Sequence, residues 1–382
     1  MLGGLHREAR RAYAAAGMLF KLHLDLLYQC DLDCQHCYLD DKSRRILPTA
    51  FWIDVLDQAA ALGVFSLTLS GGEIFLRKDL FELIAHARAR GLFVQLKSHG
   101  GHIDAAAAHR LAALGVSAVA LSYYATRPEI HDAITRVPGS HARTRAAFEH
   151  LVAAGVTAIA SCIVMRDNRD EWRAVLDECA ARGVLVTLDG HLTHALSGDA
   201  FPRAHALDPE DAIALERHRL GHLETDCEAP GPPGAVGATG ADDGWGDRKS
   251  CGAGHTSLYV SPEGDVTPCV MWPEPLGNLA RGERLDALWV APAGRLAELR
   301  GLRQRDRETC LRCEVREHCD YCAGQSFAAT GQPTAPLRAL CETTRVKTLA
   351  RAAALGLPEP PLPAGLITSA RPRFVVRPAP RG

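Results

Sequence analysis

Patterns typical of strands and helices alternate along residues 21–190, and this alternation limits the possible fold more than any other feature of the chain. Six strand–helix units in succession predict a parallel sheet with helices on its outside. Because crossovers between parallel strands are right-handed, such a sheet curls into an open or closed barrel. The expected fold class is α/β: a partial (β/α)6 barrel of the TIM-like kind, followed by a cysteine-rich C-terminal domain.

Polar, Gly-rich or Cys-rich residues follow the expected strands. Active sites of parallel sheets lie at the C-terminal strand ends, so we expect the site to be built from these loops. Asp79 and Asp104 are the expected N-caps of two helices. The expected strands are 21–28, 65–69, 92–96, 116–121, 156–164 and 184–188, and the expected helices are 49–62, 79–90, 104–114, 144–154 and 169–181. The loops carry Cys30–Cys37, Ser70–Glu73, Ser98–Gly100, Ser122–Tyr124 and Arg166–Asn168.

Thirteen cysteines stand out in this chain of 382 residues. An odd number in a long chain argues against a secreted disulfide scaffold. Ten of them fall into short, spaced groups, and grouped thiols in a reducing compartment usually bind metal. We therefore expect a cytoplasmic metalloprotein. Cys162 and Cys179, in an expected strand and an expected helix, are predicted to be buried apolar thiols instead.

Charge and hydropathy narrow the classes of partner. The formal net charge is −2, from 43 Lys and Arg against 45 Asp and Glu, which gives no sign of a nucleic-acid or anionic-membrane surface. No apolar run approaches the ~20 residues of a membrane span. Lys21, His23 and Asp25 interrupt the apolar run near the N-terminus and no cleavage site follows, so we expect no signal peptide.

The first cysteine group reads Cys30-x3-Cys34-x2-Cys37 and directly follows the first expected strand. Three thiolates on one short loop can hold three irons of a cubane [4Fe–4S] cluster and leave the fourth iron without a protein ligand. Structural zinc is the alternative, but zinc takes four closed ligands. His36 could be the fourth, although it would be crowded between two cysteines.

This loop, the aromatic Tyr38 beside its last cysteine, and Gly71-Gly72-Glu73 after the second expected strand together resemble the radical S-adenosylmethionine (SAM) superfamily. In that family the unliganded iron binds the amino and carboxylate groups of SAM. An electron passed to the sulfonium breaks the bond to the 5′ carbon. The resulting 5′-deoxyadenosyl radical abstracts a hydrogen atom from the substrate.

The resemblance implies roles for particular residues, with Cys30, Cys34 and Cys37 as cluster ligands. Ile74 departs from the proline that usually follows the motif glutamate. Many members have an arginine where this chain has Thr135, so its neighbour Arg136 is either a partner of the SAM carboxylate or a surface cation. No catalytic residue is assigned. The residues expected to contact SAM are His36, Tyr38, Gly71, Gly72, Glu73, Ser122 and Arg136.

The second cysteine group resembles the SPASM extension of radical SAM enzymes, which carries two further [4Fe–4S] clusters. One spacing departs from that pattern, with two residues instead of three before Cys322. No cysteine lies just upstream of Cys251, so one cluster either recruits Cys227 or has an open iron. The implied ligands are Cys310, Cys313, Cys319 and Cys341 for one cluster, and Cys251, Cys269 and Cys322 for the other.

Members with SPASM domains mostly modify ribosomally made peptides by crosslinking or epimerising residues, so the resemblance implies a precursor peptide as substrate. A sulfatase-maturase-like protein modifier is an alternative, although Val270 stands where those enzymes have an aspartate after the equivalent of Cys269. Two more alternatives are a tetrapyrrole side-chain-modifying enzyme of the haem pathway and a non-catalytic iron–sulfur protein.

The resemblance also implies protein partners. We expect a reductant such as flavodoxin or ferredoxin. Because only about 20 residues precede the first strand, a leader peptide would be read by a separate protein.

Composition also predicts how the chain is divided. Residues 229–246 are rich in Gly and Pro and are expected to form a flexible loop. The resemblance to radical SAM and SPASM proteins covers about residues 21–345. The expected segments are an N-terminal extension (1–20), the partial barrel (21–200), a connecting segment (201–250), the SPASM domain (251–345), and a helix end with a Pro/Arg-rich tail (346–382).

Overall fold

The computed structural model describes residues 2–39, 41–42, 46–226, 246–249, 251–311, 313, 315–316, 319 and 321–355. Contacts between residues divide the chain into two compact units. The first comprises Met1–Ala206 and Gly252–Arg300, and the second comprises Leu207–Cys251 and Gly301–Gly382. The first unit thus contains the region in which the sequence predicts the barrel, together with a later segment of the chain.

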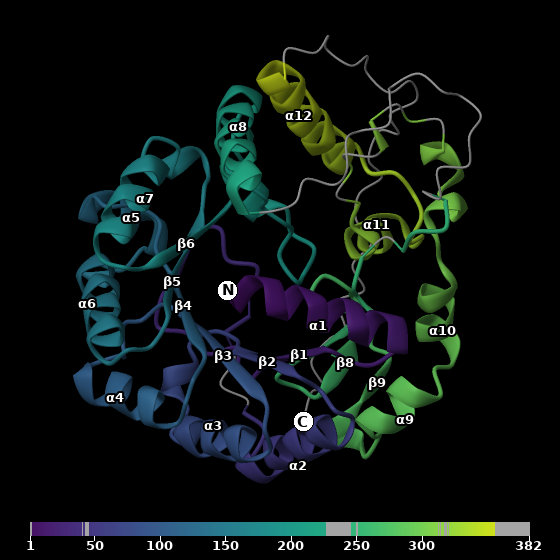
Figure 1. Ribbon diagram of the computed structural model, residues 1–382, viewed down its shortest axis with the longest axis horizontal. Coiled ribbons are helices and arrows are strands. Elements are labelled where there is room, and N and C mark those ends of the chain that lie inside the picture. The colour runs from purple at the N-terminus through teal and green to yellow at the C-terminus, as the bar shows by residue number, and fades with distance from the viewer. Residues whose placement is uncertain are drawn as a thin grey trace. The chain divides into compact units, whose positions relative to one another are not determined.

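One sheet of nine strands forms the centre of the first unit (Figure 1). Its order is β6-β5-β4-β3-β2-β1-β7-β8-β9, and β1 to β6 are parallel neighbours in chain order. The sheet does not close, since β6 and β9 are its edges, so the predicted α/β fold with a partial barrel is confirmed. The strands are β1 (Lys21–Asp25), β2 (Ser66–Ser70), β3 (Phe93–Ser98), β4 (Ala118–Ser122), β5 (Ala158–Ile163), β6 (Leu185–Asp189), β7 (Ser257–Val260), β8 (Asp265–Thr267) and β9 (Gly277–Asn278).

Helices cover the outer face of the sheet in the first unit (Figure 1). Among them, α2 (Thr49–Ala61) packs beside α3 (Leu80–Ala89), and α4 (Ala105–Ala113) packs beside α6 (Ser140–Ala153). The other helices are α1 (Leu2–Ala16), α5 (Pro128–Thr135), α7 (Trp172–Ala181), α9 (Leu285–Val290) and α10 (Gly294–Gly301), with short 3-10 helices η1 (Ile74–Leu76), η2 (Arg166–Asn168), η3 (Phe201–His205) and η4 (Leu279–Arg281).

Side chains alternate between the two faces of the strands. Leu24 of β1 and its register partner Leu69 of β2 are buried, on the face that packs against the helices. The intervening residues point to the inside of the barrel and are polar: His23 is level with Thr68, and Thr68 with Gln95. The concave inner face therefore offers hydrogen-bonding groups across β1, β2 and β3.

The two predicted N-caps behave differently. Asp104 caps α4, because its side chain accepts a hydrogen bond from the amide of Ala107 at 2.7 Å. Asp79 occupies the N-cap position of α3 but makes no capping hydrogen bond. Its carboxylate accepts from Arg77 and from the Thr49 hydroxyl instead, because a charge-assisted bond to arginine is stronger than a bond to a backbone amide.

Several elements lie where the sequence analysis predicts none, and α5 and β7 are the ones that most affect the site. The eight-residue helix α5 follows β4, and the predicted helix after it begins earlier than expected, at Ser140. The strand β7 pairs in parallel with β1, Lys21 opposite Ser257, and so adds a distant segment to the sheet. The strands β8 and β9 continue it in antiparallel fashion.

In the second unit, α8 (Pro209–Asp226) packs against α12 (Arg338–Leu355), although the two are far apart in sequence. The unit also contains η5 (Gln304–Asp306), η6 (Glu308–Cys310) and α11 (Ala323–Thr330). No helix among the described residues is long and apolar enough to cross a membrane. Most of the predicted Gly/Pro-rich loop, and the tail after Leu355, lie outside the described residues.

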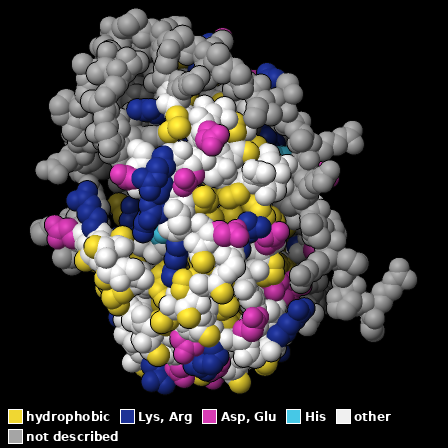
Figure 2. Space-filling model, turned by 90° about the vertical axis from the view of Figure 1, so that its right-hand side faces the viewer, with side chains coloured by type: hydrophobic (Ala, Val, Ile, Leu, Met, Phe, Trp, Pro, Cys, Tyr) yellow, Lys and Arg dark blue, Asp and Glu magenta, His cyan; other side chains and the backbone are white. Residues whose placement is uncertain are grey.

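Charges of both signs are mixed on the face of the molecule that lies at the right of Figure 1, where α9 runs. Figure 2 shows this face, on which acidic and basic side chains lie between apolar ones. Such mixing agrees with the formal net charge of −2.

Candidate functional site

The cysteine loop, residues 30–37, follows the C-terminal end of β1 and is fixed by the end of α5. The amides of Asp33 and Gln35 each donate a hydrogen bond of 3.0 Å, to the carbonyl oxygens of Thr135 and Ile134 respectively. Carbonyl groups in the last turn of a helix have no partner within the helix. The loop therefore satisfies the end of α5, and α5 in turn holds the middle of the loop.

The three thiols of the cysteine loop fit an iron–sulfur cluster. All three are partly buried. Burial raises the pKa of Cys30 to about 11, although the amide of Leu32 donates to its Sγ at 3.4 Å. Burial, and then the neighbouring Cys37 and Cys30, raise the pKa of Cys34 to about 12. Thiols that oppose one another's ionisation lie within electrostatic reach, and iron that binds them would displace their protons.

The segment Gly71-Gly72 lies directly against the backbone that leads into the cysteine loop. The amide of Gly72 donates to the carbonyl oxygen of Leu27, and the amide of Glu73 donates to that of Gln29, both at 2.8 Å. A Cβ atom at Gly71 would lie 2.4 Å from the Leu27 oxygen, and one at Gly72 would lie 2.2 Å from the Gln29 oxygen. Only glycine allows this approach, so the motif sets the position of the loop.

Glu73 is fully buried, and its carboxylate joins the ends of β2 and β3. The Ser98 hydroxyl lies 2.9 Å from both carboxylate oxygens, and the amide of His99 donates to one of them at 2.9 Å. The amide of Phe75 donates at 3.0 Å from the first turn of η1. These donors hold the Glu73 carboxylate in place between β2, η1 and β3.

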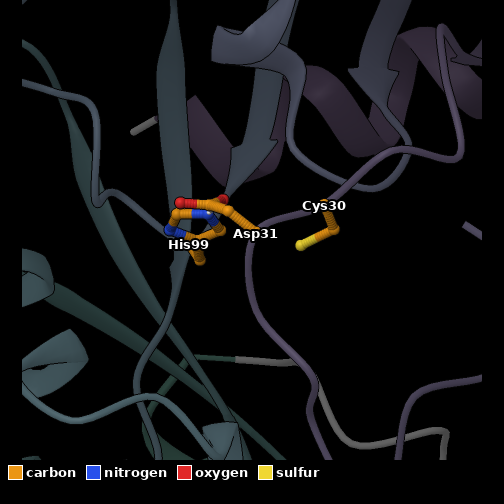
Figure 3. Close-up of side chains that lie close together, drawn as sticks. All are labelled: Cys30, Asp31 and His99. Atoms are coloured by element: carbon orange, nitrogen blue, oxygen red, sulfur yellow. Dashed lines mark hydrogen bonds and ion pairs between the residues drawn. The ribbon is translucent and has the colours of Figure 1, made fainter. Parts of the chain in front are cut away.

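Asp31 and His99 lie in two of the loops from which the site was expected to be built, although no role was predicted for either side chain. Figure 3 shows the Asp31 carboxylate against the His99 imidazole, with the Cys30 sulfur to one side. The distance from His99 Nε2 to Asp31 is 2.8 Å, and His102 Nε2 lies 3.0 Å from the other carboxylate oxygen. Cys30, Asp31 and His99 place one ligand atom each within 4.8 Å of one another. His99 could be predicted as a site residue from the sequence because it directly follows the third expected strand.

Burial would raise the pKa of Asp31, but the hydrogen bond from His99 and the charges of His99 and His102 lower it. Asp31 is therefore ionised at neutral pH. The carboxylate connects the cysteine loop to the loop after β3.

A second polar cluster lies at the end of β1, beneath the cysteine loop. Asp25 is fully buried and accepts hydrogen bonds from the hydroxyls of Tyr38 at 3.2 Å and Tyr259 at 2.9 Å. His23 Nε2 lies 3.1 Å from the other oxygen. Burial would raise the pKa of Asp25, yet the contacts with His23, Tyr259 and Tyr38 lower it. Through Tyr38, which directly follows Cys37, this carboxylate anchors the end of the loop.

His36, Tyr124 and Ser122 lie together at the end of β4. The His36 ring meets the Tyr124 ring edge-on with 4.9 Å between centroids, and the Ser122 side chain is near enough to Tyr124 to lower the pKa of its hydroxyl, although burial raises that pKa more strongly. Burial lowers the pKa of His36 to about 4, so the imidazole is neutral at pH 7. Its Nδ1 is buried without a hydrogen-bond partner in the described part of the chain. Two of the residues expected to contact SAM are thus brought together.

Arg136 lies at the end of α5 with a left-handed backbone (φ 57°). Its side chain is 56% exposed, and its guanidinium lies 3.4 Å from the Asp33 carboxylate of the cysteine loop. Lys42 lies 3.0 Å from the same side chain. The structure therefore places Arg136 in an exposed ion-pair group on the outside of the loop.

Four cysteines of the second group line one cavity in the second unit, together with Arg307, Tyr321 and Thr344. Four thiols around one cavity fit a [4Fe–4S] cluster with all its irons bound by protein. Cys251 and Cys322 belong to the second unit, whereas Cys269 belongs to the first. That these three cysteines bind one auxiliary cluster stays a prediction. Cys227 lies outside the described residues. The four lining cysteines are Cys310, Cys313, Cys319 and Cys341.

Two family sequence models match the chain, one in its N-terminal half and one in its C-terminal half. The model of the radical SAM superfamily matches residues 26–179. The SPASM model, an iron–sulfur cluster-binding domain, matches residues 251–314.

Curated relatives and solved structures agree with this assignment. The chain is 32% identical to a PqqA peptide cyclase of Streptomyces rochei over 92% of this chain and 96% of that protein. It is 29% identical to the mycofactocin maturase MftC of Mycobacterium ulcerans, over 81% of this chain and 84% of that one. Streptococcus suis SuiB, in a crystal structure with its precursor peptide SuiA, has a similar fold, with a TM-score of 0.64 at 16% identity over 85% of this chain and 77% of that chain.

These matches define the class of the protein as an enzyme that uses SAM and iron–sulfur clusters. The chain belongs to the radical SAM superfamily and carries a SPASM domain. Its cofactors are accordingly SAM with a [4Fe–4S] cluster, and further iron–sulfur clusters in the SPASM domain.

Proposed function

We propose that the protein uses SAM and a [4Fe–4S] cluster on the cysteine loop to modify a ribosomally synthesised precursor peptide, by crosslinking or epimerising its residues. The observation that carries this proposal is the cysteine loop, packed on Gly71-Gly72 at the end of β2, in a chain similar to a PqqA peptide cyclase along most of its length. When bound, the cluster would supply one electron to the sulfonium of SAM, so that the bond between sulfur and the 5′ carbon breaks and gives methionine and a 5′-deoxyadenosyl radical.

The chain's own residues then hold the reactants. Cys30, Cys34 and Cys37 would bind the cluster, and the backbone of residues 71–73 would accept hydrogen bonds from the SAM amino group. His36, Tyr38 and Ser122 would shape the adjoining pocket, and the exposed ion pair of Arg136 with Asp33 supports a surface role for that arginine. The polar inner face of β1, β2 and β3 would hydrogen-bond the peptide beside SAM.

The second group of cysteines would hold two auxiliary clusters. Cys310, Cys313, Cys319 and Cys341 would bind one, which is supported by the cavity that they share. Cys251, Cys269 and Cys322 would bind the other, with its fourth position open or filled by Cys227.

Two further proteins are part of the proposal. A flavodoxin- or ferredoxin-like reductant would supply electrons, and a separate protein would read the leader of the precursor. The grouped thiols favour a reducing, cytoplasmic compartment.

The alternatives are not favoured. Two relatives that match most of the chain are named as a peptide cyclase and a mycofactocin maturase, which favours a peptide over a tetrapyrrole as the substrate. Val270 stands where sulfatase maturases have an aspartate. The intact cysteine loop and Gly71-Gly72-Glu73 segment argue against an iron–sulfur protein without radical chemistry.

The test combines anaerobically reconstituted protein, SAM, dithionite and a short peptide encoded beside its gene. We expect 5′-deoxyadenosine together with a modified peptide. A crosslink would remove a pair of hydrogen atoms from the peptide mass, and epimerisation in heavy water would add deuterium without such a loss. Conversion of a tetrapyrrole substrate, with every neighbouring peptide unchanged, would contradict the proposal.

A further inference from the structure

Arg307 lies in the wall of the four-cysteine cavity of the second unit, between η5 and η6. It is only 3% exposed. A guanidinium group that has lost most of its contact with water acts strongly on its immediate neighbours, because the low local dielectric screens its charge weakly.

Neighbouring groups fix the direction of this guanidinium. Arg307 Nη1 donates to Oε1 of Gln304, and the guanidinium carbon lies 3.6 Å from the centroid of the Tyr321 ring. Stacking on an aromatic face and a hydrogen bond at the edge both suit the planar shape of arginine. The other terminal nitrogen, Nη2, donates to the Sγ of Cys319 at 3.9 Å.

Thr344 also lies close to the same sulfur. Its Oγ1 is 3.4 Å from Cys319 Sγ, but it is 2.8 Å from the carbonyl oxygen of Leu340. A hydroxyl has a single hydrogen, and the carbonyl oxygen is the nearer and stronger acceptor. The guanidinium is therefore the charged donor to Cys319.

We propose that Arg307 raises the reduction potential of the auxiliary cluster held by Cys310, Cys313, Cys319 and Cys341, an inference that rests on the proposed function of these four thiols as cluster ligands. Reduction adds one electron to the cluster, supplied by an external reductant, and neither makes nor breaks a bond. A buried cation and an N–H···S hydrogen bond both stabilise the added negative charge. Arg307 therefore makes this cluster a better electron acceptor than it would be without the guanidinium group.

The experiment is a potentiometric titration of the full-length reconstituted protein, followed by electron paramagnetic resonance. The signal of this cluster is the one that Cys341→Ala removes. In Arg307→Met we expect the midpoint to move to more negative potential, with the equilibrium constant for reduction about tenfold lower, the size of one lost hydrogen bond to a charged group. Iron content is measured on each sample.

Arg305→Met is the matched control, since it removes the same charge two residues away. Arg305 is 61% exposed and pairs with Asp247, so water and salt screen its charge. In Arg305→Met we expect the midpoint potential of this auxiliary cluster and the iron content of the protein to equal those of the wild type.

Four outcomes would overturn the inference. One is a full iron content in Arg307→Met with an unchanged midpoint. If Arg307→Met loses the cluster, Arg307→Gln decides, because it keeps a polar side chain without the charge. An unchanged midpoint in that variant, or loss of its cluster as well, would show that Arg307 serves the fold instead. A wild-type protein without a cluster at this site would overturn the ligand set too.

Discussion

At the residue scale, Gly72 has no room for a side chain. A Cβ atom there would meet the backbone oxygens of Gln29 and Tyr28 at 2.2 and 2.5 Å. Gly72→Ala must therefore displace the start of the cysteine loop, and a displacement of about 1 Å can lower catalysis about a hundredfold. We expect SAM cleavage, measured as 5′-deoxyadenosine, to fall by that order. Gly301→Ala, where a Cβ meets nothing within 4 Å, should leave it unchanged.

The cysteine loop itself gives a sharper test. Replacing Cys30, Cys34 and Cys37 together by Ala is expected to abolish SAM cleavage while the auxiliary clusters remain, because this group packs beside Gly71-Gly72. Cleavage is measured with dithionite, and the auxiliary clusters by iron content. Cys162→Ala removes a buried thiol of β5 outside both groups and should retain wild-type cleavage. Product formation by the triple variant would refute the assignment.

Asp25 is expected to make stability depend on acidity. Its folded pKa lies below the ordinary value of 3.8, so its contribution is present above that pH and is lost as the pH falls through the folded value. Asp25→Asn should therefore cost about 1–3 kcal/mol at pH 7 and progressively less below pH 4. Denaturant unfolding of the cluster-free chain measures this difference. Asp286→Asn, an exposed carboxylate, should show none of it.

At the element scale, Glu73 joins the ends of β2, η1 and β3, because its carboxylate accepts hydrogen bonds from three donors: the amides of Phe75 and His99 and the hydroxyl of Ser98. In Glu73→Gln one carboxylate oxygen becomes an NH2 group that faces donors. We expect the unfolding free energy to fall by about 1–3 kcal/mol, the cost of a buried unsatisfied polar group. Glu82→Gln, in the first turn of α3, tests whether loss of charge alone matters. Equal stabilities of the two variants would contradict a clamp by Glu73.

Local pattern was enough to predict β1 to β6 and the helices between most of them. It missed α5 because eight residues give too little helical periodicity. It missed β7 because four residues carry almost no signal, and their pairing with β1 depends on contacts across more than 200 residues of sequence. The same limit applies to the site: cysteine spacing is local, whereas Asp31 and His99 meet only because the loops after β1 and β3 lie at the same edge of the sheet, with β2 between the two strands.

At the scale of the whole molecule, the cysteine loop and the four-cysteine cavity are held by different elements. The cysteine loop belongs to the first unit, where the end of α5 and the segment after β2 support its backbone. The four-cysteine cavity belongs to the second unit, where η6 contains Cys310 and α12 contains Cys341. Since neither scaffold uses an element of the other, loss of one cluster need not remove the other.

Because the two cluster sites have separate scaffolds, the iron content should change in steps of one cluster. Anaerobically reconstituted protein should bind close to three [4Fe–4S] clusters, about 12 irons per chain, because ten cysteines form the expected ligand sets. Cys341→Ala removes a ligand from the four-cysteine cavity and should lower the content by about four irons. It should still cleave SAM, since the cysteine loop is untouched, while Cys179→Ala, a buried thiol of α7, should lose no iron. Iron and acid-labile sulfide assays measure both numbers. A content near four irons with zinc in the cavity would show that the second group holds a structural metal, and the radical chemistry would then depend on the first cluster alone.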